Sequence, residues 1–256
     1  MTTTRSEASS FFYESQIVVV GGFIRGVGTN RIERMNIQDK PGHWMDFPVK
    51  LRGEIYGHKV VCYEDRLIVI GGCGGRTISD VINEIILTPP YPKKVLSRMP
   101  QPRGRHGVEL VKDKIFIVGG ESTMPKILSS VLMYDINKNE CKEMSPLPLA
   151  VNQMATVVWK ESIIVIGGQD EKREGLNSVI MYDVNTGKCK MLPLMKYKRQ
   201  ACTAVVTGDV IVVMGGYDGR KTLNSVECFD LIRQVWEELP PMIERRSHAT
   251  AILKLI

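Results

Sequence analysis

The side chains that could do chemistry in this chain are few and scattered. Four histidines stand at positions 43, 58, 106 and 248, and six cysteines at 62, 73, 141, 189, 202 and 228. No cysteines form a Cys-x-x-Cys pair, and no histidines have the spacing of a zinc site. The known signatures of zinc proteases, serine hydrolases and phosphate loops are also missing. We therefore expect no catalytic residue, no metal and no cofactor, and we expect buried thiols in a reducing compartment.

Three of the histidines recur at related places. His58 and His106 each stand thirteen residues before a Gly-Gly pair, and His248 aligns with them, while Met154 and Cys202 take that place elsewhere. A ring of metal ligands would need convergence and supporting partners. We interpret these histidines as structural residues of a strand.

The elements that must position any site are five copies of one short pattern. Each copy is an apolar run that ends in a Gly-Gly pair. The pairs begin at positions 21, 71, 119, 167 and 215, at intervals of 50, 48, 48 and 48 residues. A fixed period in this range indicates a repeat architecture. The glycines suit a turn with unusual dihedrals where neighbouring units crowd.

Each repeat carries four segments that predict short antiparallel strands. Two apolar runs joined by a tight polar turn are typical of a hairpin, and the second run leads into Gly-Gly. A third segment carries an aromatic residue, as in Val131–Asp135, Val179–Asp183 and Val226–Asp230. A fourth leads to prolines that end the outermost strand. The sequence therefore predicts an all-β, five-bladed β-propeller with four strands per blade.

The two ends of the chain predict how the blades close. The first repeat begins at a second strand, Gln16–Val20, and the chain ends on a first strand, His248–Leu253. First and second strands match in number only if the C-terminal strand pairs with the N-terminal blade, which removes open strand edges. A six-bladed ring cut short would leave the tail without an edge. We expect a disordered lead-in over residues 1–14 and a propeller over residues 15–256.

Composition limits the class of partner. The chain has 256 residues, 43% of them apolar, and a net charge of +6 that is spread in ones and twos. No apolar run reaches the roughly 20 residues of a membrane-spanning helix, and no secretory signal precedes the first repeat. Without a basic block we expect neither nucleic-acid nor membrane binding. We expect a cytoplasmic protein with a modest preference for acidic partners.

The last repeat resembles a Kelch repeat, more narrowly those of the BTB-Kelch, or Kelch-like, proteins. The residues that carry the likeness are Gly215-Gly216-Tyr217-Asp218-Gly219, Leu223–Asp230, Trp236, Leu239–Met242, Arg245 and His248. The likeness extends over about residues 15–256 and implies a Kelch propeller. Two repeats depart from it, because Cys141 and Cys189 replace the usual late Trp. The second repeat has prolines around Tyr91, which leaves its outer strand undefined.

The resemblance implies a partner-binding rim. In Kelch-like domains the residue fourteen before each Gly-Gly pair, at the start of the innermost strand, and the loops after the pair contact a substrate peptide. Loops on a rigid scaffold often carry function. The corresponding residues here are Arg25, Gly57, Arg76, Arg105, Glu121, Gln153, Gln169, Ala201, Tyr217, Asp218, Arg220 and Ser247.

Two of these residues have chemistry suited to a peptide. Arg105 carries a planar fork that matches a carboxylate, and Tyr217 can anchor a peptide by burial and its hydroxyl. The alternative for each is an ordinary exposed loop residue. Arg103 and Arg199 recur sixteen residues before their Gly pairs, with Arg245 in register. We expect these three to form structural ion pairs or loop clamps.

The function implied by the resemblance is a protein-interaction module. Such a domain recognises the substrate of a cullin-RING ubiquitin ligase, here a protein or peptide that is acidic or of mixed charge. The cullin would be reached only through a BTB segment, which precedes the Kelch region in that family and is not among these residues. One alternative is an actin-binding Kelch protein. A Kelch-type oxidase or sugar epimerase is disfavoured, because a copper oxidase needs converging Tyr, His and Cys ligands.

Overall fold

The computed structural model describes residue 1, residues 3–123 and residues 126–253. Within these residues the chain forms 24 strands and no helix, so it contains no helix that could cross a membrane. The chain divides into two compact units, residues 1–105 and residues 106–253. The first unit holds two four-stranded sheets and the second holds three.

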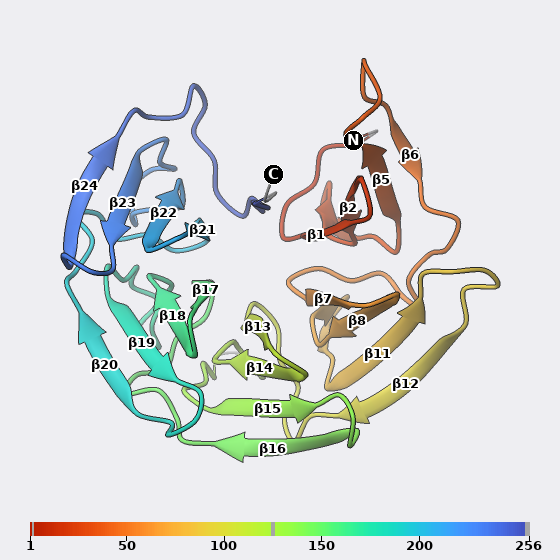
Figure 1. The fold of residues 1–256 in the computed structure, drawn as a ribbon, viewed down its shortest axis with the longest axis horizontal. Coiled ribbons are helices and arrows are strands. Elements are labelled where there is room, and N and C mark those ends of the chain that lie inside the picture. The colour runs from red at the N-terminus through yellow and green to blue at the C-terminus, as the bar shows by residue number, and fades with distance from the viewer. Residues whose placement is uncertain (2, 124–125, 254–256) are drawn as a thin grey trace. The chain divides into compact units, whose positions relative to one another are not determined.

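Both sheets of the first unit are antiparallel (Figure 1). The strands of the first sheet are, in spatial order, β1 (Ser9–Tyr13), β2 (Gln16–Val20), β5 (Ile32–Asn36) and β6 (Trp44–Asp46). Those of the second are β7 (Lys59–Tyr63), β8 (Arg66–Ile70), β11 (Val81–Ile86) and β12 (Lys93–Arg98). Two short hairpins follow the Gly-Gly pairs, namely β3 (Phe23–Ile24) with β4 (Val27–Gly28) and β9 (Cys73–Gly74) with β10 (Thr77–Ile78).

The three sheets of the second unit repeat one strand order from the inner to the outer edge. The first comprises β13 (Gly107–Val111), β14 (Lys114–Val118), β15 (Val131–Asp135) and β16 (Glu140–Met144). The second comprises β17 (Ala155–Trp159), β18 (Ser162–Ile166), β19 (Val179–Asp183) and β20 (Cys189–Leu192). The third comprises β21 (Thr203–Thr207), β22 (Val210–Met214), β23 (Val226–Asp230) and β24 (Val235–Leu239).

Innermost strands of successive sheets lie next to one another within each unit. In the second unit β13 contacts β17 and β17 contacts β21 (Figure 1), and in the first unit β1 contacts β7. Successive sheets therefore pack face to face as blades do. The predicted fold class, all-β with five propeller blades of four antiparallel strands, is confirmed.

The cores lie between successive blades and explain the continuous apolar second strands. All four of residues 163–166 are buried, because Ile163 and Val165 pack in the core on one face of their sheet and Ile164 and Ile166 in the core on the other. The aromatic residues predicted for the third strands, Tyr134, Tyr182 and Phe229, have no exposed surface. Full burial of such a side chain contributes about 1.5–3 kcal/mol. The repeat period thus places one aromatic in each blade of the second unit.

The Gly-Gly pair ends the second strand in a turn that touches the next linker. A linker is the segment between the outer strand of one blade and the inner strand of the next. Gly215 has a φ of 62° and Gly216 a φ of 96°, both in the region that favours glycine. A Cβ on Gly216 would lie 2.9 Å from the carbonyl oxygen of Gln200. The second glycine of every pair donates its amide to a linker carbonyl. The five bonds are Gly22 to Ile55, Gly72 to Arg103, Gly120 to Val151, Gly168 to Arg199 and Gly216 to Arg246, with lengths of 2.8, 2.7, 2.8, 2.8 and 2.8 Å.

The expected closure by the C-terminal strand is corrected by the structure. The inner strand of the first blade is Ser9–Tyr13, which pairs with β2 from Ser9↔Val20 to Tyr13↔Gln16. His248–Leu253 forms no strand. The prediction missed Ser9–Tyr13 because its first two residues are serines, although Phe11 faces the core and is 7% exposed. Part of the expected disordered lead-in, Ser9–Tyr13, is therefore an ordered strand.

The second blade has an outer strand where the sequence left one undefined. Strand β12, Lys93–Arg98, pairs with β11, and the register shifts between Ile82 and Asn83. The prolines near Tyr91 lie in the connection between the two strands, where the absence of an amide donor breaks no ladder bond.

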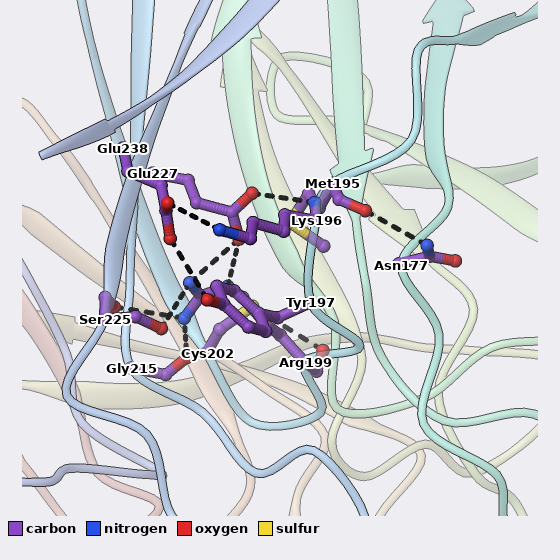
Figure 2. Close-up of polar contacts among 10 residues, drawn as sticks. All are labelled: Asn177, Met195, Lys196, Tyr197, Arg199, Cys202, Gly215, Ser225, Glu227 and Glu238. Atoms are coloured by element: carbon purple, nitrogen blue, oxygen red, sulfur yellow. Dashed lines mark hydrogen bonds and ion pairs between the residues drawn. The ribbon is translucent and has the colours of Figure 1, made fainter.

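A buried ion pair links Arg199 to Glu227 (Figure 2). The Arg199 Nε and Nη2 atoms donate to Glu227 Oε1 at 3.0 and 2.9 Å, and Nη1 donates to the carbonyl oxygen of Gly215 at 2.6 Å. Nη2 also donates to the Ser225 hydroxyl at 2.7 Å, and both charged side chains are at most 1% exposed. The structural ion pair predicted for Arg199 is confirmed. Arg5 and Glu33 make the same pair in the first blade.

Removing one partner of this pair is expected to destabilise the protein strongly. The Arg199→Met variant would leave the Glu227 carboxylate buried without its cation, at a cost of about 3–5 kcal/mol. The fourth blade has Val151 and Ile180 at the equivalent places, both 1% exposed. The double variant Arg199→Val/Glu227→Ile copies that solution and should recover most of the loss in urea unfolding. A double variant no more stable than Arg199→Met would contradict this interpretation.

Candidate partner-binding loops

The segments that lead into the inner strands are joined by backbone hydrogen bonds between equivalent residues. In the first unit the amide of Gly57 donates to the Glu7 carbonyl and that of Arg105 to the Gly57 carbonyl, at 2.9 and 2.7 Å. In the second unit the amide of Ala201 donates to the Gln153 carbonyl at 2.8 Å. All of these residues have a φ between 50° and 58°. The predicted position is thus a repeated backbone feature of both units.

The last repeat is one residue out of the predicted register. His248, not Ser247, has the positive φ of 54° and donates its amide to the Ala201 carbonyl at 2.9 Å. The equivalent of Arg199 is likewise Arg246, whose carbonyl accepts from Gly216, and not Arg245. Ser247 is therefore the neighbour of the inner position, and His248 is not equivalent to His58. The loop after the last Gly-Gly pair is one residue shorter than that of the fourth blade, because Leu223 bonds back to Gly216 where Leu176 bonds back to Gly168. The sequence spacing alone could not locate this difference.

Arg105 is engaged inside the first unit. Its Nε and Nη2 atoms donate to the two carboxylate oxygens of Glu7 at 2.8 and 3.1 Å, and its guanidinium lies 5.6 Å from the Tyr56 ring centre. Phe23 packs on the same Tyr56 ring with centroids 4.7 Å apart. The planar fork expected to bind a partner's carboxylate therefore holds one from its own chain. A partner's carboxylate would have to compete with Glu7.

Sequence reasoning missed Glu7 because it lay in the expected lead-in. The signal that could have found it is the interval of 50 residues to Gly57, the same as that between the first two Gly pairs. Tyr56 could have been found as the residue before that position.

Arg25 and Arg76 stand at the tips of the two hairpins in the first unit. Both residues are exposed. Gly26, which follows Arg25, and Gly75, which precedes Arg76, have φ values of 92° and 59° that allow each tight turn. A cation on a short hairpin is fixed in place by the paired strands beside it, and it remains accessible to an acidic group.

Four predicted residues of the second unit come together through one network. Asn152 donates from Nδ2 to Glu121 Oε2 at 3.1 Å in a buried bond, and its backbone bridges to Gln169. Gln153 donates from Nε2 to Gln169 Oε1 at 3.3 Å. The backbone bond from Ala201 to Gln153 extends this network to the next linker. Asn152, which the sequence pattern did not single out, lies at its centre.

The loop of the last repeat is shaped by Asp218. Its Oδ1 accepts the backbone amides of Arg220 at 2.7 Å and Lys221 at 2.8 Å. These amide bonds, that from Lys221 first, lower the pKa of Asp218. Asp170 caps the equivalent loop of the fourth blade in a similar way, accepting the amides of Lys172 and Glu174. The carboxylate of Asp218 thus holds the loop, and the loop presents the partly exposed Tyr217 and the exposed Arg220.

The histidines do not form a metal centre. Among the described residues no group of three His, Cys, Asp or Glu side chains could hold a metal ion. His58 and His106 are buried at 1% and 0% exposure, each just before the inner strand of its blade. Burial lowers the pKa of His58 to about 3, so this imidazole is neutral at physiological pH. It packs beside Gly21 and Gly72, consistent with the structural role expected from the sequence.

Comparison with known proteins places the chain in a family. Residues 57–254 match the KLHDC2/KLHL20/DRC7 Kelch-repeats domain, and the chain belongs to this family. It is similar to Kelch-like protein 7 of Rattus norvegicus and of Mus musculus, at 49% identity over 53 residues, which is 21% of this chain and 9% of each relative. It is also similar to Kelch-like protein 40 of Xenopus laevis, at 26% identity over 146 residues, which is 56% of this chain and 23% of the relative. The chain thus matches less than a quarter of the length of these curated relatives. It is a Kelch-repeat domain, and its kinship with the Kelch-like proteins implies a protein-interaction module.

The buried histidine predicts a pH dependence of stability. His58 has a pKa of about 3 when folded against an ordinary 6.5, so the unfolded chain binds the extra proton between these values. Stability should therefore fall as the pH drops from about 6.5, by up to about 1.4 kcal/mol per pH unit from this group. His58→Met copies Met154 of the fourth blade and should flatten the slope in urea unfolding between pH 6.5 and 4.5. The exposed His43→Gln should leave the slope unchanged, and an unchanged slope in His58→Met would refute the assignment.

Proposed function

We propose that this chain recognises a protein partner through the loops that follow its Gly-Gly pairs and the linkers bonded to them. We call these the post-glycine loops. The observation that carries the proposal is the repeated backbone bond between equivalent linker residues, such as Ala201 to Gln153. It holds polar and aromatic side chains on rigid strands, which lowers the entropy lost on binding.

The charge of the post-glycine loops favours an acidic segment in the partner. In the first unit the loop tips present exposed Arg25 and Arg76. In the second unit Tyr217 is partly exposed, and Arg220 is exposed beside it. Arginine pairs with carboxylates in a planar fork, and tyrosine contributes burial with a polar end. An extended peptide with carboxylates and an apolar side chain fits this chemistry.

The same family supports a more specific role. The Kelch-like relatives suggest a substrate-recognition domain that delivers its partner to a cullin-RING ubiquitin ligase. Contact with the cullin would be made by a BTB segment, supplied by another part of a longer chain or by another protein. In that arrangement the post-glycine loops choose the substrate, and the BTB segment sets where it is modified.

Partner capture should depend on the post-glycine loops. Charge reversal in Arg25→Glu/Arg76→Glu, and separately Tyr217→Ala, should each reduce the amount of partner captured from a cell lysate at least several-fold. Because these side chains are not buried in the cores, the melting temperature should change by no more than about 2 °C. Lys190→Glu, an exposed charge reversal on the outer strand β20, is the matched control and should capture normally.

The proposal is wrong if both loop variants capture the same proteins as the parent chain in equal amounts. The ligase role has its own test, in which this chain is joined to the BTB segment of a Kelch-like protein. The captured partner should then become ubiquitinated with the parent loops and not with Tyr217→Ala. Capture without ubiquitination would retain the binding role and exclude the adaptor role.

A further inference from the structure

One position in the second blade departs from a pattern that the first, fourth and fifth blades complete, and the third blade combines Arg103 with Leu132 at the same place. Arg199 meets Glu227 in the fifth blade, and the equivalent residues of the second blade are Ile55 and Asn83. The equivalence follows from the backbone, because Gly168 donates to Arg199 as Gly22 does to Ile55. In the sheets, Val213 pairs with Glu227 as Val69 pairs with Asn83.

In the first, fourth and fifth blades, two side chains fill the equivalent position in one of two ways. The first and fifth blades use a fully buried Arg–Glu ion pair. The fourth uses two apolar residues, Val151 and Ile180. Ile55 and Asn83 fit neither solution, because an apolar side chain cannot satisfy an amide. Both residues are only partly buried, and the buried Asn83 Oδ1 atom has no hydrogen-bond partner among the described residues.

Next to Ile55 and Asn83 the first unit contains a cavity. It has a volume of about 190 Å³ and lies between the linker residues 51–55 and strands β8 and β11. Its lining includes Leu51, Ile55, Val69, Gly72, Ser79 and Asn83. Ligand pockets for whole cofactors are larger, about 300–1,000 Å³. The cavity therefore suits one side chain or a molecule of similar size.

The cavity is lined by apolar side chains and by polar hydrogen-bond acceptors. Leu51, Val69 and Ile55 can cover a methylene chain, and Asn83 Oδ1 can accept a hydrogen bond at the inner end. In the exposed stretch of the linker, Glu54 adds a negative charge to the lining and Arg52 a positive one, and the Arg52 guanidinium donates to the Lys93 carbonyl at 2.8 Å. Glu84 also lines the cavity, but Arg66 and Lys94 already pair with its carboxylate. The arrangement resembles the surroundings of a long cationic side chain with a polar head.

We propose that this cavity binds a guanidinium group, the head of an arginine side chain supplied from outside the chain. The fifth blade shows how this group is held, since Arg199 donates to a side-chain acceptor and to the carbonyl oxygens of Gly215 and Ser225. The second blade's equivalents of those two carbonyls belong to Gly71 and Val81, which do not line the cavity, so the acceptor at its inner end is Asn83 Oδ1. Lysine suits the place less well, because its ammonium lacks the planar fork. Gly72, Gly74 and Thr77, which belong to the loop after the second Gly-Gly pair, also line the cavity, so it adjoins the proposed partner-binding loops. It differs from them in its ligand, because it takes a cation where the loop arginines take carboxylates.

The affinity of the natural site is expected to be modest. The amide oxygen of Asn83 is neutral, and charge-assisted bonds such as that of Glu227 are roughly twice as strong as neutral ones. Dissociation constants in the millimolar range follow for a single arginine derivative. A carboxylate at this position should tighten binding about tenfold.

The test is a titration of the purified, ¹⁵N-labelled chain with N-acetylarginine amide, followed by NMR. The amides of Gly72 and Ser79 and the side-chain amide of Asn83 should shift in a saturable way. N-acetylcitrulline amide, a neutral isostere, and N-acetyllysine amide should bind at least several-fold more weakly. A five-residue peptide with a central arginine forms a second arm. Tighter binding of the peptide would indicate a protein-borne arginine, and binding of the free derivative alone would indicate a small guanidinium compound.

Variants at positions 55 and 83 test whether the cavity binds arginine. Asn83→Glu should tighten arginine binding about tenfold, whereas Thr207→Glu, which adds the same charge at an exposed strand end, should not. Ile55→Arg/Asn83→Glu rebuilds the internal pair and should abolish binding. If that double variant does not fold, Asn83→Leu should also abolish binding, because it removes the acceptor. The proposal is overturned if neither the parent chain nor Asn83→Glu shows saturable shifts, or if citrulline binds as well as arginine.

Discussion

The bond from the second glycine of each pair to the carbonyl of a linker is the constraint on which each unit depends. It occurs in all five blades, from Gly22 with Ile55 to Gly216 with Arg246. The turn that permits it has two consecutive residues at positive φ, and a Cβ on the second would collide with the neighbouring linker. The bond fixes where each linker passes the preceding blade. The inner strands, the interblade cores and the post-glycine loops take their register from it.

Other features vary around this fixed point. The linker residue that accepts the glycine amide is Arg199 in one blade, Val151 in another and Ile55 in a third, and its backbone role is the same in each. Its side chain can therefore join an ion pair, pack in a core or leave a cavity. The same tolerance applies to the loops, where Asp170 and Asp218 cap similar turns that carry different neighbours. A rigid backbone with variable side chains is well suited to a recognition domain.

Most of the fold could be predicted because the repeat provides five observations of one pattern. The third strands Val131–Asp135, Val179–Asp183 and Val226–Asp230 have the predicted bounds. The failures fall at the ends, where the pattern is seen once. Ser9–Tyr13 begins with polar residues and lacks a preceding linker for comparison, so its strand was missed and the tail was assigned to its place.

The candidate site was predictable in position more than in contacts. The repeat located Gly57, Arg105, Gln153 and Ala201 correctly, since each occupies the same backbone conformation. It could not reveal that Arg105 pairs with Glu7, which is distant in sequence, or that the loop after the last Gly-Gly pair is one residue shorter than that of the fourth blade. Ion pairs between distant segments depend on side-chain reach in three dimensions, and a one-dimensional period does not encode that.

Native-state hydrogen exchange, measured residue by residue by NMR, tests the central constraint most directly. The amides of Gly22, Gly72, Gly120, Gly168 and Gly216 should be among the slowest to exchange, because each is bonded to a linker and buried. The amides of the exposed glycines Gly26, Gly75 and Gly219, in the loop tips, should exchange rapidly. If the second glycines exchange as fast as the loop tips, the linker bonds do not hold the blades in register and the account is contradicted.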